Sequence, residues 1–235
     1  SNSSLVPLVT ASALGALTLI YVVRTKSSAI YDLLILRMTS LWYATVLSKL
    51  SNGSKVLDIG IGNASSLLVH TAELKAKDIT FCGVDYTREY VEAAQENIKK
   101  NKAEDNVQVV YGSVYDGSVL SSFPVKNFDA AYFSGSIALL PDPISALHSA
   151  AKVVKPSGLI YITQTYQKRG FPGLALFKRN LKFMTTIDFG ELTYEKDIME
   201  VFKASGYEIV SHQIIEGSVD NAMQSAYLTV LRVEK

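Results

Sequence analysis

The chain has 235 residues, of which 48% are hydrophobic, and its formal net charge is +1 at pH 7. A chain of this length suits one α/β domain with a sizeable hydrophobic core. The near-neutral charge gives no reason to expect nucleic acid as a partner. A single cysteine, Cys82, excludes an internal disulfide and favours a reducing compartment. No metal site is indicated.

An uncharged run lies near the start of the chain. Residues 5–23 carry no charged side chain, and Arg24 and Lys26 follow at once. We predict a hydrophobic helix within residues 1–27 that anchors the protein in a membrane, with the rest of the chain facing the cytosol. The alternative is a soluble cytoplasmic protein in which this helix packs on the domain or on a partner chain. A cleaved signal peptide is disfavoured because no basic residue precedes the run.

Residues 28–235 are predicted to form one domain. An amphipathic helix over 28–50 ends at the turn sequence Ser51-Asn52-Gly53, and strands then alternate with helices. This alternation predicts a doubly wound, mostly parallel sheet, in which the last strand, reached by a short turn, runs antiparallel. The predicted strands are 55–59, 79–84, 107–111, 128–133, 158–164, 207–215 and 225–233. The predicted helices are 64–75, 87–102, 143–154 and 194–205.

The segment 55–63 carries the most specific motif. Its apolar start predicts a buried strand, which Gly60 and Gly62 break into a tight turn before a helix. Glycines let the backbone come close to a ligand, and the first N–H groups of a helix point at it. The segment therefore predicts a nucleotide-binding turn.

Two carboxylates narrow down the nucleotide. Asp58 lies two residues before the first glycine, where it would repel a pyrophosphate but suit a cationic amino-acid group. Ser65 stands where a dinucleotide fingerprint has its third glycine, so an NAD-dependent dehydrogenase is disfavoured. Asp85 ends the second predicted strand, the usual place for a carboxylate that binds both hydroxyls of a ribose.

Four segments, taken in order, resemble the class I S-adenosylmethionine (SAM) dependent methyltransferases. They are Asp58-x-Gly60-x-Gly62 with the later Asp85, the strand 128–134, the loop 139–143 and the turn 155–158. The resemblance covers residues 50 to 235 and is nearest to small-molecule methyltransferases of the quinone-biosynthesis type. It implies a seven-stranded Rossmann-like sheet with an N-terminal helical extension, SAM as cofactor and S-adenosylhomocysteine as product.

The resemblance also implies roles for residues that follow the strands. The cofactor-binding residues would be Asp58, Gly60, Gly62, Asn63, Asp85, Tyr86, Ser113, Val114 and Ser134. Asp58 would interact, directly or through water, with the ammonium group of the methionine part. Asp85 would bind the ribose, and Tyr86 would lie against the adenine. The family usually carries an acid for the adenine amino group where this chain has Ser113, so the adenine contacts depart from its pattern.

Methyl transfer from a sulfonium is an in-line displacement that depends mainly on positioning. No residue stands out as a catalytic base, because the three histidines, His70, His148 and His212, are interpreted as surface or structural residues. Candidate substrate neighbours are Tyr31, Ser136 and Tyr166.

A segment that interleaves basic and apolar residues, 168–184, lies between the fifth predicted strand and the next helix. It could lie on an anionic membrane, steer an acidic substrate, or form a solvated loop packed on the sheet. We expect a membrane-associated methyltransferase that acts on a small or lipophilic acceptor. The alternatives are a protein methyltransferase and a module that binds SAM without turnover.

Overall fold

The computed structural model describes residues 35–168 and 194–233. Several predictions therefore fall outside the described residues: the anchor at 5–23, the first turns of the helix at 28–50, Tyr31, and all of the basic segment after Lys168. In the part that is described, no helix combines the length and the apolar character needed to cross a membrane.

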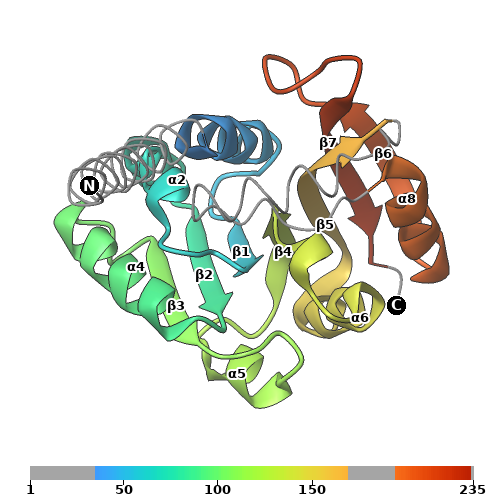
Figure 1. The fold of residues 1–235 in the computed structure, drawn as a ribbon. Helices are drawn as coiled ribbons and strands as arrows, with labels where there is room; N and C mark the ends of the chain where they lie inside the picture. Colours follow the sequence, from blue (N-terminus) through green and yellow to red (C-terminus); the bar gives the residue numbers. More distant parts are fainter. Residues whose placement is uncertain (1–34, 169–193, 234–235) are drawn as a thin grey trace, which may run out of the picture. The chain divides into compact units, whose positions relative to one another are not determined.

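Within the described residues, seven strands form one sheet in the order β3-β2-β1-β4-β5-β7-β6 (Figure 1). The strands are β1 (Lys55–Ile59), β2 (Thr80–Asp85), β3 (Val107–Tyr111), β4 (Phe128–Ser134), β5 (Val154–Gln167), β6 (Glu208–Ile214) and β7 (Gln224–Arg232). Strands β1 to β5 pair in parallel, and β7 runs antiparallel to both β5 and β6. The predicted doubly wound, mostly parallel sheet with an antiparallel last strand is confirmed.

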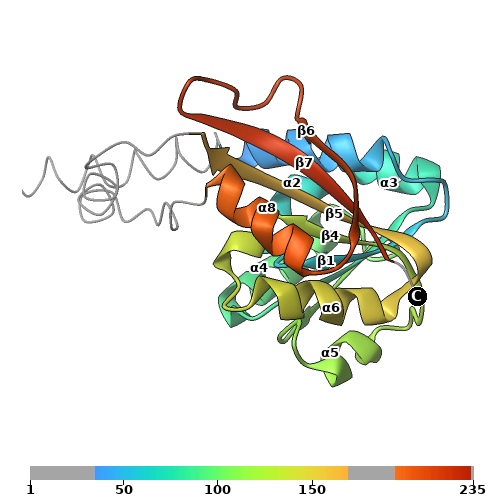
Figure 2. The ribbon, with the colours of Figure 1, turned by 90° about the vertical axis from the view of Figure 1, so that its right-hand side faces the viewer.

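Helices cover both faces of the sheet (Figure 2). A helix over 35–47 precedes β1, and the others are α2 (Ser65–Leu68), α3 (Thr71–Lys77), α4 (Arg88–Lys100), α5 (Gly117–Ser122), α6 (Pro143–Val153) and α8 (Glu195–Ala204). A short 3-10 turn, η1 (Ile137–Leu139), follows β4. Buried side chains of helix 35–47, α2, α3 and α4 pack on one face, and those of α5, α6 and α8 pack on the other. Each face thus has its own apolar core.

The structure corrects three details of the predicted elements. The predicted helix 64–75 is divided into α2 and α3 at Val69 and His70, and the ring of His70 contacts Ser40 in helix 35–47. The loop after β3 contains the unpredicted helix α5, which begins where the Asp116 carboxylate accepts a hydrogen bond from the Ser118 N–H. Strand β5 starts at Val154, opposite Phe128, although the sequence from Lys155 to Gly158 is typical of a turn.

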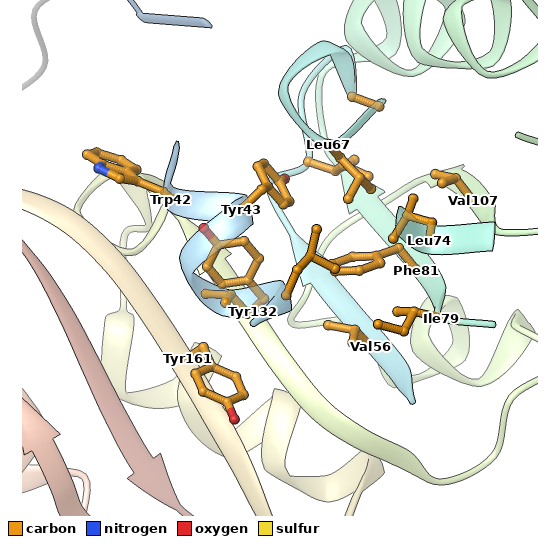
Figure 3. Packing of buried hydrophobic residues seen from close by; sticks show 14 of the residues in the cluster. Trp42, Tyr43, Val56, Leu67, Leu74, Ile79, Phe81, Val107, Tyr132 and Tyr161 are labelled. Carbon is orange, nitrogen blue, oxygen red and sulfur yellow. The ribbon is translucent and has the colours of Figure 1, made fainter. Parts of the chain in front are cut away.

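Helix 35–47 is fastened to the core on its buried side. Trp42, Tyr43, Val46 and Leu47 are all at most 3% exposed. Figure 3 shows Tyr43 reaching from this helix toward Phe81 and Tyr132 of the sheet. The indole N–H of Trp42 donates to the hydroxyl of Ser218, in the loop between β6 and β7, at 3.0 Å. The helix therefore lies on the sheet as a fixed part of the domain.

Candidate cofactor site

The glycine turn lies where the strand order reverses. Strand β1 has β2 on one side and β4 on the other. From β1 the chain adds β2 and β3 toward one edge of the sheet, and it then crosses back to add β4 and β5 toward the other edge. In open α/β sheets, ligands bind beyond the carboxyl ends of the strands at such a point. Gly60 and Gly62 have φ angles of 76° and 60°, in the left-handed region that glycine adopts without strain.

The two glycines serve different purposes. A Cβ atom added to Gly60 would come within 2.6 Å of the Ser136 Cβ, so the loop after β4 packs directly on the turn. The Ser136 hydroxyl also donates a hydrogen bond to the Ile59 carbonyl. An added Cβ at Gly62, in contrast, would meet no atom within 4 Å. The space beside Gly62 is therefore open to a ligand.

Asp58 lies at the base of the turn and is completely buried. Its Oδ2 accepts a hydrogen bond of 2.7 Å from the hydroxyl of Tyr43, while its Oδ1 has no hydrogen-bond partner among the described residues. Burial raises the pKa of Asp58 to about 7, the hydrogen bond from Tyr43 opposes this rise, and the nearby charge of Asp85 adds to it. A buried oxygen without a partner is costly, and a cationic donor would satisfy it.

Asp85 connects the turn to the next helix. Its Oδ2 accepts from the Gly62 N–H and its Oδ1 accepts from the Thr87 N–H, both at 2.9 Å. Thr87 directly precedes α4, and its own side chain makes no capping hydrogen bond. Each carboxylate oxygen can accept more than one hydrogen bond, so both retain capacity for a ligand hydroxyl.

Asn63 and Tyr86 flank these acids. The side-chain oxygen of Asn63 accepts from the Ser65 N–H at 3.1 Å, and its backbone carbonyl accepts from Asn97 of α4. Tyr86 follows Asp85 and is 71% exposed, so its ring is available to stack against a ligand. Asn63 therefore shapes the start of α2, whereas Tyr86 is free of the core.

The loop after β3 carries the remaining predicted adenine contacts. The Ser113 hydroxyl accepts from the Tyr115 N–H at 3.2 Å, and the Val114 side chain is buried in the core. The sequence reasoning did not single out Tyr111, which is half-exposed at the end of β3 and lies under the Arg88 guanidinium, 4.4 Å from the ring centroid. The glycine that follows it, Gly112, was the sequence signal that Tyr111 ends its strand at the carboxyl edge of the sheet.

A group of hydroxyls continues from Asp58 across β4 and β5. The Tyr132 hydroxyl is 2.8 Å from that of Thr163, and Ser134 lies opposite Thr163 in the sheet. Burial raises the pKa of both Tyr43 and Tyr132, and hydrogen bonding to the Ser134 side chain partly offsets this rise. Tyr43 was missed in the sequence, although its spacing of three residues from Val46 places it on the buried face of the helix.

The described candidate substrate neighbours lie deeper than expected. Ser136 is 7% exposed and is committed to Ile59. Tyr166 is completely buried beside the rings of His212 and Tyr227, on the face of the sheet opposite to Tyr43 and Tyr132. Its hydroxyl has no hydrogen-bond partner in the described ranges. Contact of either residue with substrate remains a prediction, and it would require access that their burial does not provide.

Each histidine has a structural partner. The Nε2 atom of His70 is 2.9 Å from the Ser40 carbonyl, and that of His148 is 2.9 Å from the Ser205 carbonyl. His212 lies between Thr229 and Glu195 and stacks on Tyr227 with ring centroids 4.4 Å apart. Burial lowers the pKa of His212, and Glu195 partly opposes this. None of them lies on the glycine turn.

Neither a metal-binding cluster nor a competing pocket accompanies the glycine turn in the described residues. No group of three or more histidine, cysteine or acidic side chains there could hold a metal ion. A cavity of about 550 Å³ lies at the opposite, amino ends of β1, β4 and β5, lined in part by Lys55, Asp129 and Lys155. Its polar, open lining lacks the features of the glycine turn, so the turn is the candidate for the cofactor site.

The fold and the turn between two acids define a class I SAM-dependent methyltransferase. Residues 50–231 match the family model Methyltransf_31, described as a methyltransferase domain. The chain belongs to this methyltransferase family, and it is a SAM-dependent enzyme.

Known proteins agree with this assignment. The chain is 26% identical over 183 residues to a demethylmenaquinone methyltransferase of Staphylococcus epidermidis. The matched segment covers 75% of this chain and 70% of the relative. It is 22% identical over 158 residues to an O-methyltransferase of Aspergillus nomiae, covering 67% and 66%. A solved SAM-dependent methyltransferase from Aquifex aeolicus shares the fold, with a TM-score of 0.61 at 17% identity, covering 84% and 92%. The comparisons do not favour the peptide-methylating or non-catalytic alternatives.

The close approach at Gly60 is testable by alanine substitution. Gly60→Ala would add both left-handed backbone strain and a clash with Ser136, so we expect it to lower the free energy of unfolding. Gly53→Ala is the matched control, because Gly53 has nearly the same φ of 75° but open space around an added Cβ. In urea unfolding, we expect Gly60→Ala to lose about 1–3 kcal/mol more than the control. Equal losses would contradict the packing of Ser136 on the turn.

Proposed function

We propose that the site at the glycine turn holds SAM with the methionine part at Asp58, Gly60, Gly62 and Asn63. The observation that carries this assignment is the buried Oδ1 atom of Asp58, which lacks a partner among the described residues. An ammonium group would satisfy that oxygen and favour the ionised carboxylate. When bound, SAM supplies a methyl group activated by a positively charged sulfur.

On the other side of the turn, we assign the ribose hydroxyls to Asp85 and the adenine to Tyr86, Ser113 and Val114. Two backbone hydrogen bonds fix the Asp85 carboxylate, so it is oriented before any ligand arrives. This preorganisation reduces the conformational entropy lost on binding. Ser134, half-buried at the end of β4, would lie at the methionine end of the site, where it borders Tyr43 and Tyr132.

We infer that the methyl acceptor is a small, lipophilic molecule of the quinol or phenol type. The names of the two relatives support this class. The acceptor would bind beyond the carboxyl ends of β4 and β5, where the side-chain oxygens of Gln164 and Thr165 have no hydrogen-bond partner within the described part. The residues of the site would act mainly by holding the reactants in line. No described histidine lies at the turn, so an acceptor hydroxyl would lose its proton to solvent water, and the resulting oxyanion would attack the methyl group as the sulfonium becomes the neutral thioether of S-adenosylhomocysteine.

Asp85→Ala tests the cofactor assignment. Loss of the carboxylate removes the ribose partner, so we expect SAM affinity in calorimetric titration to fall about 10- to 100-fold. Ser113→Asp is the control, since it introduces the acid that the family usually carries and should not weaken binding. NADH should give no signal with either protein. Unchanged SAM affinity in Asp85→Ala would disprove the assignment.

The acceptor class is tested by label transfer. The purified chain is incubated with SAM labelled in its methyl group and, separately, with 1,4-naphthohydroquinone, a lipophilic phenol, a thiol and an amine. We expect label in the organic extract of the quinol or phenol reaction, together with S-adenosylhomocysteine. Label in precipitated protein would instead indicate a peptide acceptor. Reactions without acceptor and with Asp85→Ala provide the background.

We further propose that residues 1–27 form a membrane anchor in front of the domain at 28–235, and that the basic segment 168–184 lies on the membrane. The support is the uncharged run at 5–23 followed by Arg24 and Lys26. The full chain and a chain that starts at residue 28 are each expressed in cells, and the membrane fraction is washed with alkaline carbonate and pelleted. The full chain should stay in the membrane pellet, whereas the chain that starts at residue 28 should be released to the supernatant. Release of the full chain would exclude an integral anchor and favour the packed helix.

A further inference from the structure

Tyr43 has no role in the function proposed above, yet its hydroxyl forms the one hydrogen bond seen to the Asp58 carboxylate in the described residues. The two side chains are 3% and 0% exposed, so this 2.7 Å contact is shielded from water. In such surroundings a hydrogen bond to a charged group is stronger than it would be at the surface. Tyr43 thus stabilises the charged form of a carboxylate whose burial disfavours it.

The surrounding structure holds Tyr43 in this position. Its ring packs edge-on against Tyr132, with centroids 5.0 Å apart, and against Phe81 at 6.1 Å. Helix 35–47 is fastened to α2 and α3 by further hydrogen bonds, among them one of 3.0 Å from the Lys77 ammonium to the Leu47 carbonyl. The hydroxyl is therefore directed at Asp58 by a rigid support rather than by chance contact.

The two oxygens of Asp58 are consequently unequal. Oδ2 is taken by Tyr43, whereas Oδ1 is buried and has no partner within the ranges that the structure describes. We propose that Tyr43 is a positioning residue for the cofactor: it holds Asp58 ionised and oriented through Oδ2, and leaves Oδ1 to accept the ammonium group. This inference rests on the proposed role of Asp58 in cofactor binding.

A pH dependence follows from this arrangement. The ionisable groups that face Asp58 are Tyr43 from helix 35–47, Tyr132 from β4 and Asp85 from β2. An ammonium group binds the ionised carboxylate, so protonation of Asp58 competes with binding. Since the pKa of Asp58 is about 7, affinity should fall as the pH drops below that value, by at most about tenfold per pH unit for one proton.

The experiment compares ligand affinity across pH in two hydroxyl deletions. Tyr43→Phe removes the hydrogen bond to Asp58 but keeps the ring. Tyr132→Phe is the matched control, because it removes a buried hydroxyl that bonds Thr163 instead. The probe is S-adenosylhomocysteine, titrated by calorimetry between pH 5.5 and 8.5, with 5′-methylthioadenosine, which lacks the amino-acid part, as the second ligand.

We expect the acid limb of the S-adenosylhomocysteine profile to move upward by about one pH unit in Tyr43→Phe, as loss of a hydrogen bond to a charged group predicts. Tyr132→Phe should leave the limb in place, and binding of 5′-methylthioadenosine should be insensitive to Tyr43. Equal weakening of Tyr43→Phe at every pH, or a shift no larger than in Tyr132→Phe, would overturn the inference. Tighter binding by Tyr43→Phe would also overturn it, because Tyr43 would then be a competitor.

Two further measurements distinguish the role of Tyr43 from the role of Asp58 in cofactor binding. If Asp58→Asn binds S-adenosylhomocysteine as well as the unaltered chain, the role of Asp58 itself fails. If Asp58→Asn binds weakly but Tyr43→Phe shows no pH shift, only the role of Tyr43 fails. NMR titration of carboxyl-labelled aspartate in the ligand-free chain gives a direct readout, in which the Asp58 midpoint should lie higher in Tyr43→Phe.

Discussion

A carboxylate buried at the carboxyl end of β1 is the constraint on which the arrangement of this site depends. Asp58 is in the central part of the sheet, between Gly83 of β2 and Tyr132 of β4, and no water-exposed surface reaches it. Burial of a charge without partners is unfavourable, so the surrounding elements must supply hydrogen bonds or the group must stay protonated. Helix 35–47 supplies one donor, and the other carboxylate oxygen has no hydrogen-bond partner among the described residues.

This constraint explains why elements far apart in sequence converge on the turn. Helix 35–47 contributes Tyr43, β4 contributes Tyr132, and the loop after β4 contributes Ser136, which packs on Gly60. On the other side, Asp85 connects the turn to the start of α4 through backbone N–H groups. The turn and Asp58 are thus contacted by helix 35–47, by β4 with the loop after it, and by the end of β2, so the geometry exists before a ligand binds. Such preorganisation suits a reaction whose rate depends on alignment.

The fold could be predicted largely from the sequence, because its signals are local. Strand β1 is a short apolar run that ends at glycines, and α4 follows Thr87 with an acidic first turn. The errors occurred where tertiary contacts override local preference. The predicted helix 64–75 is interrupted at Val69 and His70, where the His70 ring contacts Ser40 of another helix, and β5 extends through a turn-like sequence in which Val154 pairs with Phe128.

The candidate site divides in the same way. Asp58, Gly60 and Gly62 belong to one short motif, and Asp85 was expected beside them because it ends the next strand of a parallel sheet. The contact between Tyr43 and Asp58, and that between Ser136 and Gly60, join residues on separate elements, and no local pattern encodes them. Burial of Tyr166 likewise depends on β6, β7 and their rings, which sequence periodicity does not place.

The position of helix 35–47 has a consequence for where this enzyme begins as a working unit. The segment shared with the methyltransferase family starts at residue 50, after this helix. A recombinant fragment cut at that border would keep every recognisable motif but lose the donor to Asp58. It would also uncover the apolar surface beneath Trp42, Val46 and Leu47. The family match therefore covers less than the packed core, which includes side chains of helix 35–47.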